Sequence, residues 1–240
     1  MKIKNHYLKK IAAWLLPYTC LFCSASSSRQ QDICQACLDD LPKLENPCPR
    51  CAKPLPFAHS DLTCGECIKL SPPFDFTHAL FAYESPITRF IMQLKFNHAL
   101  VNARILGELL TEKIQRDWYQ HKPLPNLIIP MPLHPNRLKE RGFNQAIEIA
   151  RPIAKSLQLP LQLSDCLRIK ETAAQATLLA KERQYNIKQA FKVNKNFSGQ
   201  HIAVIDDVIT TGHTMTEFCK SLKKAGASKI DVWCCARPYL

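Results

Sequence analysis

The chain has 240 residues, of which 46% are hydrophobic, and a formal net charge of +12. This length is enough for one sizeable core plus a small second module. No stretch approaches the roughly 20 apolar residues of a membrane-spanning helix, so the sequence predicts no membrane span. Residues 71–240 carry 23 basic and 14 acidic residues, against 9 and 6 in residues 1–70. The excess positive charge favours a polyanionic partner for the later part of the chain.

The first sixteen residues combine four lysines with a short apolar patch, as a secretion signal does. The patch is too short for a signal, and cleavage before Cys20 would leave a predicted metal ligand as the new terminus. Leu8, Ile11 and Leu15 instead recur at helical spacing. We therefore predict a short amphipathic helix here that covers the core.

Eight of the twelve cysteines form four Cys-x-x-Cys pairs. Each pair can direct two thiolates at one tetrahedral ion, so four pairs provide for two sites of four thiolates each. We expect two structural zinc ions, closed to substrate, that help the module to fold. The predicted ligands are Cys20, Cys23, Cys34, Cys37, Cys48, Cys51, Cys64 and Cys67.

Two alternatives to this zinc arrangement remain. Four disulfides in a secreted module are disfavoured by the Cys-x-x-Cys geometry, and we expect a cytoplasmic protein whose reduced thiolates hold zinc. Consecutive pairing of the cysteines is the simplest arrangement, but spacing alone leaves an interleaved pairing open.

Two zinc tetrathiolates would lower the net charge of +12 to about +8, so the protein stays basic. The other four cysteines are interpreted as buried thiols: Cys166, Cys219, Cys234 and Cys235.

The domain boundary is predicted near residue 72. Residues 1–72 lack regular apolar periodicity and could not bury enough surface alone, which makes zinc essential there. Turn residues follow at Pro72, Pro73 and Asp75. We therefore expect a zinc-binding module over 1–72 and a second domain over 73–240. In that domain we predict a strand at 78–83, a helix with Ser85 as N-cap and Pro86 as first residue through about Phe96, and a helix over 103–120.

Residues 128–146 read as an apolar strand followed by a basic loop and a helix. Three prolines, Pro130, Pro132 and Pro135, would stiffen the loop. Its basic cluster suits a diphosphate, because arginine meets phosphate oxygens in a bidentate way. The cluster consists of Arg137, Lys139 and Arg141.

The most informative stretch is 201–214, HIAVIDDVITTGHT. Residues 202–205 predict a strand buried on both faces of a parallel sheet, with Asp206 and Asp207 at its carboxyl end. Ligands bind at that edge of open α/β sheets, and a following helix can direct free N–H groups at an anion. Gly212 permits the turn, and Thr214 is predicted to cap a helix from Met215 to about Ala225. An ordinary polar connection is the competing interpretation.

This stretch resembles the phosphoribosyl-diphosphate (PRPP) signature of type I phosphoribosyltransferases. The resemblance implies that Asp206 and Asp207 hold the ribose hydroxyls near a Mg²⁺ bound with PRPP. Residues of the loop would hold the 5′-phosphate: Ile209, Thr210, Thr211, Gly212, His213 and Thr214. Purine-type members often carry an acid where this chain has Thr210, which disfavours purine salvage. The His213 side chain is either an extra phosphate ligand or, as we favour, exposed to solvent.

The motif PLHPxRxxxRGFNQ at residues 132–145 closely resembles a motif of the ComF/GntX family. Further matches within 168–186 look like the family's flexible segment over the active site: Arg168, Thr172, Gln175, Arg183 and Asn186. The family implies a type I phosphoribosyltransferase-like parallel sheet flanked by helices, preceded by a small zinc-ribbon module. The implied catalytic residues are Asp206, Asp207, Arg137 and Arg141, with Lys139 binding phosphate.

Two functions follow from this resemblance. The first is a cytoplasmic ComF-type competence protein that receives single-stranded DNA during natural transformation, with PRPP or phosphate in its pocket and a helicase or DNA-processing protein as a possible partner. Basic residues with interleaved aromatic rings would bind the strand: Lys95, Arg137, Lys139, Arg141, Phe143, Arg168 and Arg183. Segments 95–96, 137–143 and 188–195 offer both ingredients, although solvated charges around core aromatics explain any one of them equally well. The alternative is an active phosphoribosyltransferase with an unidentified nitrogenous acceptor.

Overall fold

The computed structural model describes residues 18–56, 62–171 and 187–239. The chain divides into two compact units, Met1–Pro42 and Lys43–Leu240. The second group of four cysteines therefore belongs to the same compact unit as the sheet. The sequence instead predicts a domain boundary after this group, near residue 72. The first unit contains the helix α2 (Gln35–Asp39), and the amphipathic helix predicted around Leu8 to Leu15 lies outside the described residues.

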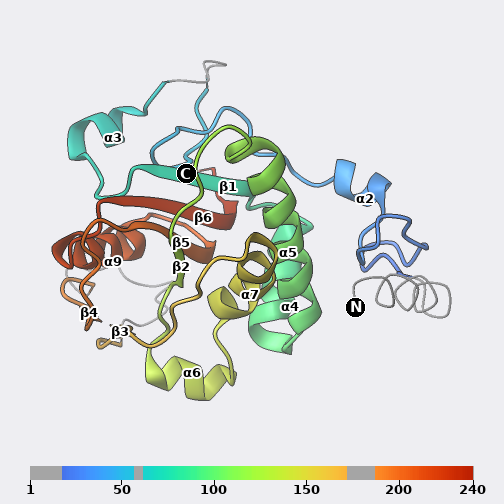
Figure 1. Cartoon of the computed structure of the whole chain (residues 1–240). Helices are drawn as coiled ribbons and strands as arrows, with labels where there is room; N and C mark the ends of the chain where they lie inside the picture. Colours follow the sequence, from blue (N-terminus) through green and yellow to red (C-terminus); the bar gives the residue numbers. More distant parts are fainter. Residues whose placement is uncertain (1–17, 57–61, 172–186, 240) are drawn as a thin grey trace, which may run out of the picture. The chain divides into compact units, whose positions relative to one another are not determined.

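The second unit is built on a four-stranded parallel sheet with the strand order β1-β6-β5-β2 (Figure 1). The central strands β5 and β6 are buried almost throughout, as the continuous apolar run at 202–205 predicts. The four strands are β1 (Phe76–Ala82), β2 (Leu127–Pro130), β5 (His201–Val208) and β6 (Lys229–Arg237).

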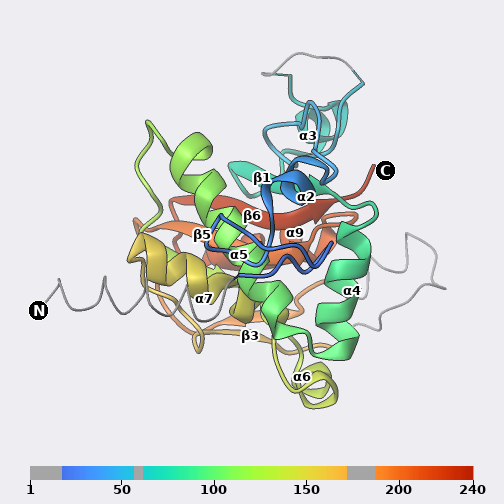
Figure 2. The same ribbon diagram turned by 90° about the vertical axis from the view of Figure 1, so that its right-hand side faces the viewer.

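Helices cover both faces of the sheet (Figures 1 and 2). One face carries α4 (Ile87–Asn97), α5 (Leu100–Lys113), its π-helical extension η1 (Ile114–Trp118) and α7 (Gln145–Leu157). The opposite face carries α9 (His213–Lys224) and the antiparallel pair β3 (Cys166–Arg168) and β4 (Phe191–Val193). The short helices α3 (Gly65–Leu70) and α6 (Pro135–Arg141) complete the unit. This is the fold class predicted from the sequence.

The core explains why the elements pack in this way. Alternate residues of β5 and β6, such as Val204 and Val232, pack with Phe218 of α9 in one apolar cluster. On the other face, α5 meets α7 at Gly107, where an added Cβ would lie 2.4 Å from the Ile149 carbonyl oxygen. The absence of a side chain at Gly107 therefore allows the two helices to approach closely. The four cysteines outside the Cys-x-x-Cys pairs are buried, as predicted.

Three local predictions need correction. The helix predicted from Pro86 begins at Ile87, so Pro86 rather than Ser85 is its N-cap residue. The basic cluster predicted on a loop lies on α6, because His134 caps that helix with its ring and Pro135 occupies its first turn. Thr214 does not cap α9: the helix begins at His213, and Gly212 is the N-cap residue with φ of 79°.

Among the described residues, no helix is both long enough and apolar enough to span a membrane.

Candidate functional site

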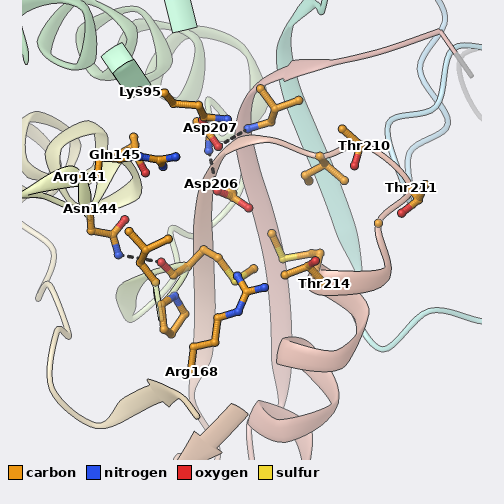
Figure 3. A pocket seen from close by; sticks show the side chains of 17 residues that line it. Lys95, Arg141, Asn144, Gln145, Arg168, Asp206, Asp207, Thr210, Thr211 and Thr214 are labelled. Atoms are coloured by element: carbon orange, nitrogen blue, oxygen red, sulfur yellow. Dashed lines mark hydrogen bonds and ion pairs between the residues drawn. The ribbon is translucent and has the colours of Figure 1, made fainter. Parts of the chain in front are cut away.

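A cavity of about 220 Å³ opens at the carboxyl ends of β2 and β5 (Figure 3). It brings together side chains from segments that are far apart in the sequence. Its lining includes Lys95, Arg141, Asn144, Gln145, Arg168, Asp206, Asp207, Ile209, Thr210, Thr211, Gly212 and Thr214. The two predicted aspartates and one predicted arginine of the α6 cluster therefore converge on one hollow.

The two aspartates are consecutive residues near the end of β5, and both line the pocket. Each carboxylate accepts a hydrogen bond from the backbone amide of the next residue. Oδ1 of Asp206 accepts from the Asp207 amide, and Oδ1 of Asp207 accepts from the Val208 amide, both at 2.9 Å. The other oxygen of Asp207 lies 2.5 Å from the ammonium group of Lys95 on α4. Asp207 is thus already paired with a cation, whereas Asp206 faces the side of the pocket where Arg168 lies (Figure 3).

The electrostatics of the pair follow from this asymmetry. Burial, followed by the charge of Asp207, raises the pKa of Asp206 well above its usual value. Burial alone would lower the pKa of Lys95, but the adjacent Asp207 outweighs it and the net shift is upward. Lys95 therefore remains charged at neutral pH. Asp206 holds its proton more tightly than an ordinary aspartate until a hydrogen-bond donor or a cation arrives.

Two arginines supply positive charge to the pocket. Arg141, from the end of α6, and Arg168, from the end of β3, both line it. Burial lowers the pKa of each guanidinium, which nevertheless stays protonated at neutral pH. Arg137 and Lys139 do not line this cavity. Lys139 is exposed, and Arg137 lies 3.9 Å from Glu140 on the same helix.

The loop between β5 and α9 forms another wall of the pocket. Gly212 adopts a left-handed conformation, after which the 12-residue helix α9 begins without a side-chain cap. Its first N–H groups therefore remain available for an anion. Thr210, Thr211 and Thr214 line the cavity, while His213 is half-buried and lines a different one.

Asn144 and Gln145 line the pocket but were not predicted as site residues. The Asn144 side chain caps α7 by accepting from the Ala146 amide at 2.9 Å, and its Nδ2 donates to the Met131 carbonyl at 3.0 Å. Gln145 is only 4% exposed, and its Nε2 has no hydrogen-bond partner among the described residues. A buried donor beside the pocket suits an oxygen-rich ligand. The sequence feature that could have indicated both residues is Asn144 itself, since asparagine is a preferred N-cap residue and Gln145 follows it at the start of the helix.

An exposed aromatic ring adjoins the pocket. Phe96 is 61% exposed, and the guanidinium carbon of Arg141 lies 5.7 Å from the centre of its ring. Phe143 is stacked at a tilt against His98, with 5.6 Å between ring centres. In the 188–195 segment, by contrast, Phe191 is buried against Phe218, so this aromatic belongs to the core. Of the predicted flexible segment, Thr172, Gln175, Arg183 and Asn186 lie outside the described residues.

The eight cysteines of the four pairs form two separate clusters. Cys20, Cys23, Cys34 and Cys37 make one cluster and Cys48, Cys51, Cys64 and Cys67 the other, and within each the four sulfurs lie within 4.8 Å of one another. This is the consecutive pairing predicted as the simplest. All twelve cysteines lie in the described ranges, and none forms a disulfide.

The geometry of both clusters fits zinc. The sulfurs of Cys23 and Cys34, and those of Cys51 and Cys64, are 3.7 Å apart. Four thiolates around a tetrahedral zinc with Zn–S bonds of about 2.3 Å lie about 3.8 Å apart. Each cluster thus provides a closed set of four sulfur ligands, which is typical of a structural rather than a catalytic ion.

Comparison with known proteins agrees with this architecture. Residues 11–68 match a double zinc ribbon domain, and residues 144–238 match a phosphoribosyl transferase domain. A DNA utilization protein, YhgH of Salmonella typhi, is 33% identical over 206 residues, covering 85% of this chain and 90% of that protein. Competence protein F of Haemophilus influenzae is 32% identical over 225 residues, covering 92% of this chain and 97% of that protein. Among solved structures, glutamine PRPP amidotransferase from B. subtilis matches 55% of this chain and 25% of its own, with 18% identity and a TM-score of 0.36.

The fold and the site together define a phosphoribosyltransferase-type domain joined to a double zinc ribbon. The chain belongs to the ComF family, with competence protein F and the DNA utilization protein YhgH as relatives over most of its length.

Proposed function

We propose that this protein is a ComF-type competence protein that handles incoming single-stranded DNA in the cytoplasm during natural transformation. Its pocket binds PRPP or a related sugar phosphate, and onward transfer of the strand to a helicase or another DNA-processing protein belongs to the same proposal. The competence relatives and the phosphoribosyltransferase-type domain support this role.

One observation carries the proposal: Arg141 lines the pocket and also lies against the exposed ring of Phe96. Proteins that bind single strands combine cationic groups for the phosphates with aromatic faces on which bases stack. Lys95 is adjacent to Phe96 in α4 and lines the same pocket. The two ingredients of a single-strand site therefore meet at one edge of the sheet.

The pocket also suits the chemistry of a sugar phosphate. The loop before α9 and the first turn of that helix offer N–H groups and three hydroxyls to a phosphate. Asp206 offers a carboxylate to ribose hydroxyls or to Mg²⁺. Lys95 already provides the positive charge next to Asp207. If Mg²⁺ enters with PRPP, Asp206 is the carboxylate available to hold it or its water ligands.

The test is the affinity for a fluorescent oligonucleotide, measured by anisotropy over a range of salt concentrations. We expect affinity to fall steeply with salt, and the double charge reversal Arg137→Glu with Arg141→Glu to weaken binding further and flatten the slope. Lys113→Glu with Arg116→Glu is the matched control, because it makes the same change in net charge at residues that do not line the pocket. Equal losses in the two double variants would mean that net charge, not this surface, binds the strand.

An active phosphoribosyltransferase is the alternative, favoured by the aspartate pair and by the matched domain. In that case diphosphate would be released from PRPP in the presence of a nitrogenous acceptor, and Asp206→Ala with Asp207→Ala would abolish the release. Tight PRPP binding without release across an acceptor screen would favour a binding role instead.

A further inference from the structure

The buried Arg237 joins the second cysteine cluster to the phosphate loop. Arg237 is the last residue of β6 and only 6% exposed. Its Nε donates to the carbonyl of Cys51 at 3.1 Å, and its Nη1 donates to the carbonyl of Ile209 at 2.7 Å. One rigid guanidinium therefore contacts a residue of the metal cluster and the first residue of the loop.

The cluster is also fixed to the sheet on its other side. Thr77 of β1 donates its amide to the Pro49 carbonyl at 3.0 Å and its hydroxyl to the Arg50 carbonyl at 2.7 Å. Cys51 packs against the main apolar core. The Cys48–Cys51 turn is therefore held between β1 and β6, in the same compact unit as the pocket.

Ile209 is the residue at which the loop leaves the sheet. Its amide donates to the Ala236 carbonyl at 3.3 Å, and its own carbonyl accepts from Arg237. The next residues, Thr210 to Gly212, line the pocket. The orientation of the peptide after Ile209 thus sets where the loop presents its N–H groups.

Between the cluster and the loop lies a second cavity of about 220 Å³, lined by Cys51 and Cys67 on one side and by Ile209, Thr211 and Gly212 on the other. The two Arg237 hydrogen bonds connect the Cys51 and Ile209 sides of this space. Arg237 itself forms part of the lining.

We infer that Arg237 is a positioning residue through which metal occupancy of the second cysteine cluster sets the phosphate affinity of the loop. A metal at that cluster fixes the Cys51 carbonyl, Arg237 carries this constraint to Ile209, and the loop is held in the form that receives an anion. The first cluster belongs to the other compact unit and serves as the internal comparison. The inference rests on the proposed phosphate pocket, and it adds the control of that pocket.

The first experiment measures the dissociation constant of ribose 5-phosphate by calorimetry on the full-length, zinc-loaded protein. Arg237→Lys keeps the charge but cannot reach both carbonyls with a planar fork. We expect binding about tenfold weaker, within the usual range for coupled sites, with two zinc ions still present by elemental analysis. Arg50→Lys is the matched control, because Arg50 lies in the same turn but donates to Pro72 at 3.0 Å instead of the loop. We expect it to change the affinity by less than about twofold.

The second experiment uses the reciprocity of coupled sites and needs no variant in the bridge. A chelator titration at equilibrium measures the zinc affinity of each cluster with and without saturating ribose 5-phosphate. Only the second cluster should bind zinc about tenfold more tightly when the sugar phosphate is present. Cys23→Ser, which weakens the first site alone, assigns the two transitions.

The outcomes separate the two proposals. If wild-type protein does not bind ribose 5-phosphate, the pocket assignment fails and the coupling fails with it. If it binds, but zinc affinity is unchanged and Arg237→Lys behaves like Arg50→Lys, the coupling alone is overturned. An equal gain in zinc affinity at both clusters would also overturn it, since it would indicate general stabilisation.

Discussion

The ammonium group of Lys95 lies 2.5 Å from the Asp207 carboxylate, so α4 supplies a fixed cation to the acidic end of β5. The pair is mostly buried, and only one partner comes from the motif that identifies the site. Lys95 is thus the counter-ion of Asp207, beside the second carboxylate of Asp206.

Removing this cation should destabilise the protein. Lys95→Met keeps most of the side-chain volume but leaves a buried carboxylate without its partner. We expect a loss of about 3 kcal/mol in the free energy of unfolding, at the lower end for breaking a buried pair, measured by urea denaturation. Lys95→Met combined with Asp207→Asn should recover at least half of that loss, because the orphan charge is gone. Additive losses in the double variant would contradict a direct pairing.

The raised pKa of Asp206 predicts a pH-dependent pocket. Ribose hydroxyls donate to a carboxylate better than to a carboxylic acid, so affinity for ribose 5-phosphate should fall as pH drops through the raised pKa of Asp206. The ligand phosphate also titrates near pH 6. We therefore compare wild type with Asp206→Asn by calorimetry between pH 5 and pH 8. The variant should bind more weakly at pH 8 and show only the ligand's own pH dependence. Parallel curves would exclude titration of Asp206.

Base stacking should depend on Phe96. Phe96→Ala is expected to weaken binding of a single-stranded oligonucleotide by about tenfold, since stacking of a base on an aromatic ring contributes roughly 1–3 kcal/mol. The salt dependence should stay unchanged, because no charge is removed.

Phe76→Ala provides the matched comparison for this experiment. Phe76 is 38% exposed and lies beneath Lys122 and Lys229, at 5.5 and 5.3 Å from its ring centre, but it begins β1 at the opposite end of the sheet from the pocket. The Phe76→Ala variant should bind DNA with the same affinity as the wild type. A larger loss for Phe76→Ala would place the strand at that other edge.

A buried cluster at the amino ends of β5 and β6 predicts the response to acid. Asp231 accepts from the Tyr119 hydroxyl at 2.5 Å and pairs with His201 at 2.7 Å. Burial alone would raise the pKa of Asp231, but these hydrogen bonds outweigh it and lower the pKa. Such a carboxylate stabilises the fold above its unfolded pKa of about 3.9, and this contribution disappears as pH falls through the folded pKa.

Tyr119→Phe tests this cluster. The variant removes a donor to Asp231 and the acceptor of the Trp233 indole N–H, which donates to the Tyr119 oxygen at 3.2 Å. We expect a loss of about 1–3 kcal/mol in stability at neutral pH and acid unfolding at a higher pH, followed by circular dichroism. Tyr239→Phe, at a residue that is 51% exposed, should change neither quantity.

The parts of the site that lie in one continuous segment were predictable from the sequence. The apolar run at 202–205 predicted a buried strand, and Asp206 and Asp207 at its end indeed line the pocket. The cysteine spacing likewise predicted two clusters of four thiols, because ligands in a Cys-x-x-Cys turn are local to one another. The spacing left the pairing of the turns open, and the structure shows the consecutive arrangement.

The parts that depend on tertiary packing were not predictable in the same way. Lys95 was predicted to bind nucleic acid. Nothing in the sequence of α4 indicates that its ammonium group pairs with Asp207 at the end of β5. Arg137 and Lys139 looked equivalent to Arg141, yet the short helix α6 turns only Arg141 into the cavity. Thr214 failed as a cap because α9 begins at His213, after the left-handed Gly212, two residues earlier than the hydroxyl pattern indicates.

The position of the division between Pro42 and Lys43 has a practical consequence for shortening this protein. A cut near residue 72 would remove the carbonyls to which Thr77 and Arg237 donate and leave those buried donors without acceptors. A cut after Pro42 would retain all of these acceptors. Attempts to obtain a minimal fragment that contains the pocket should therefore start at Lys43, so that the second cysteine cluster is retained.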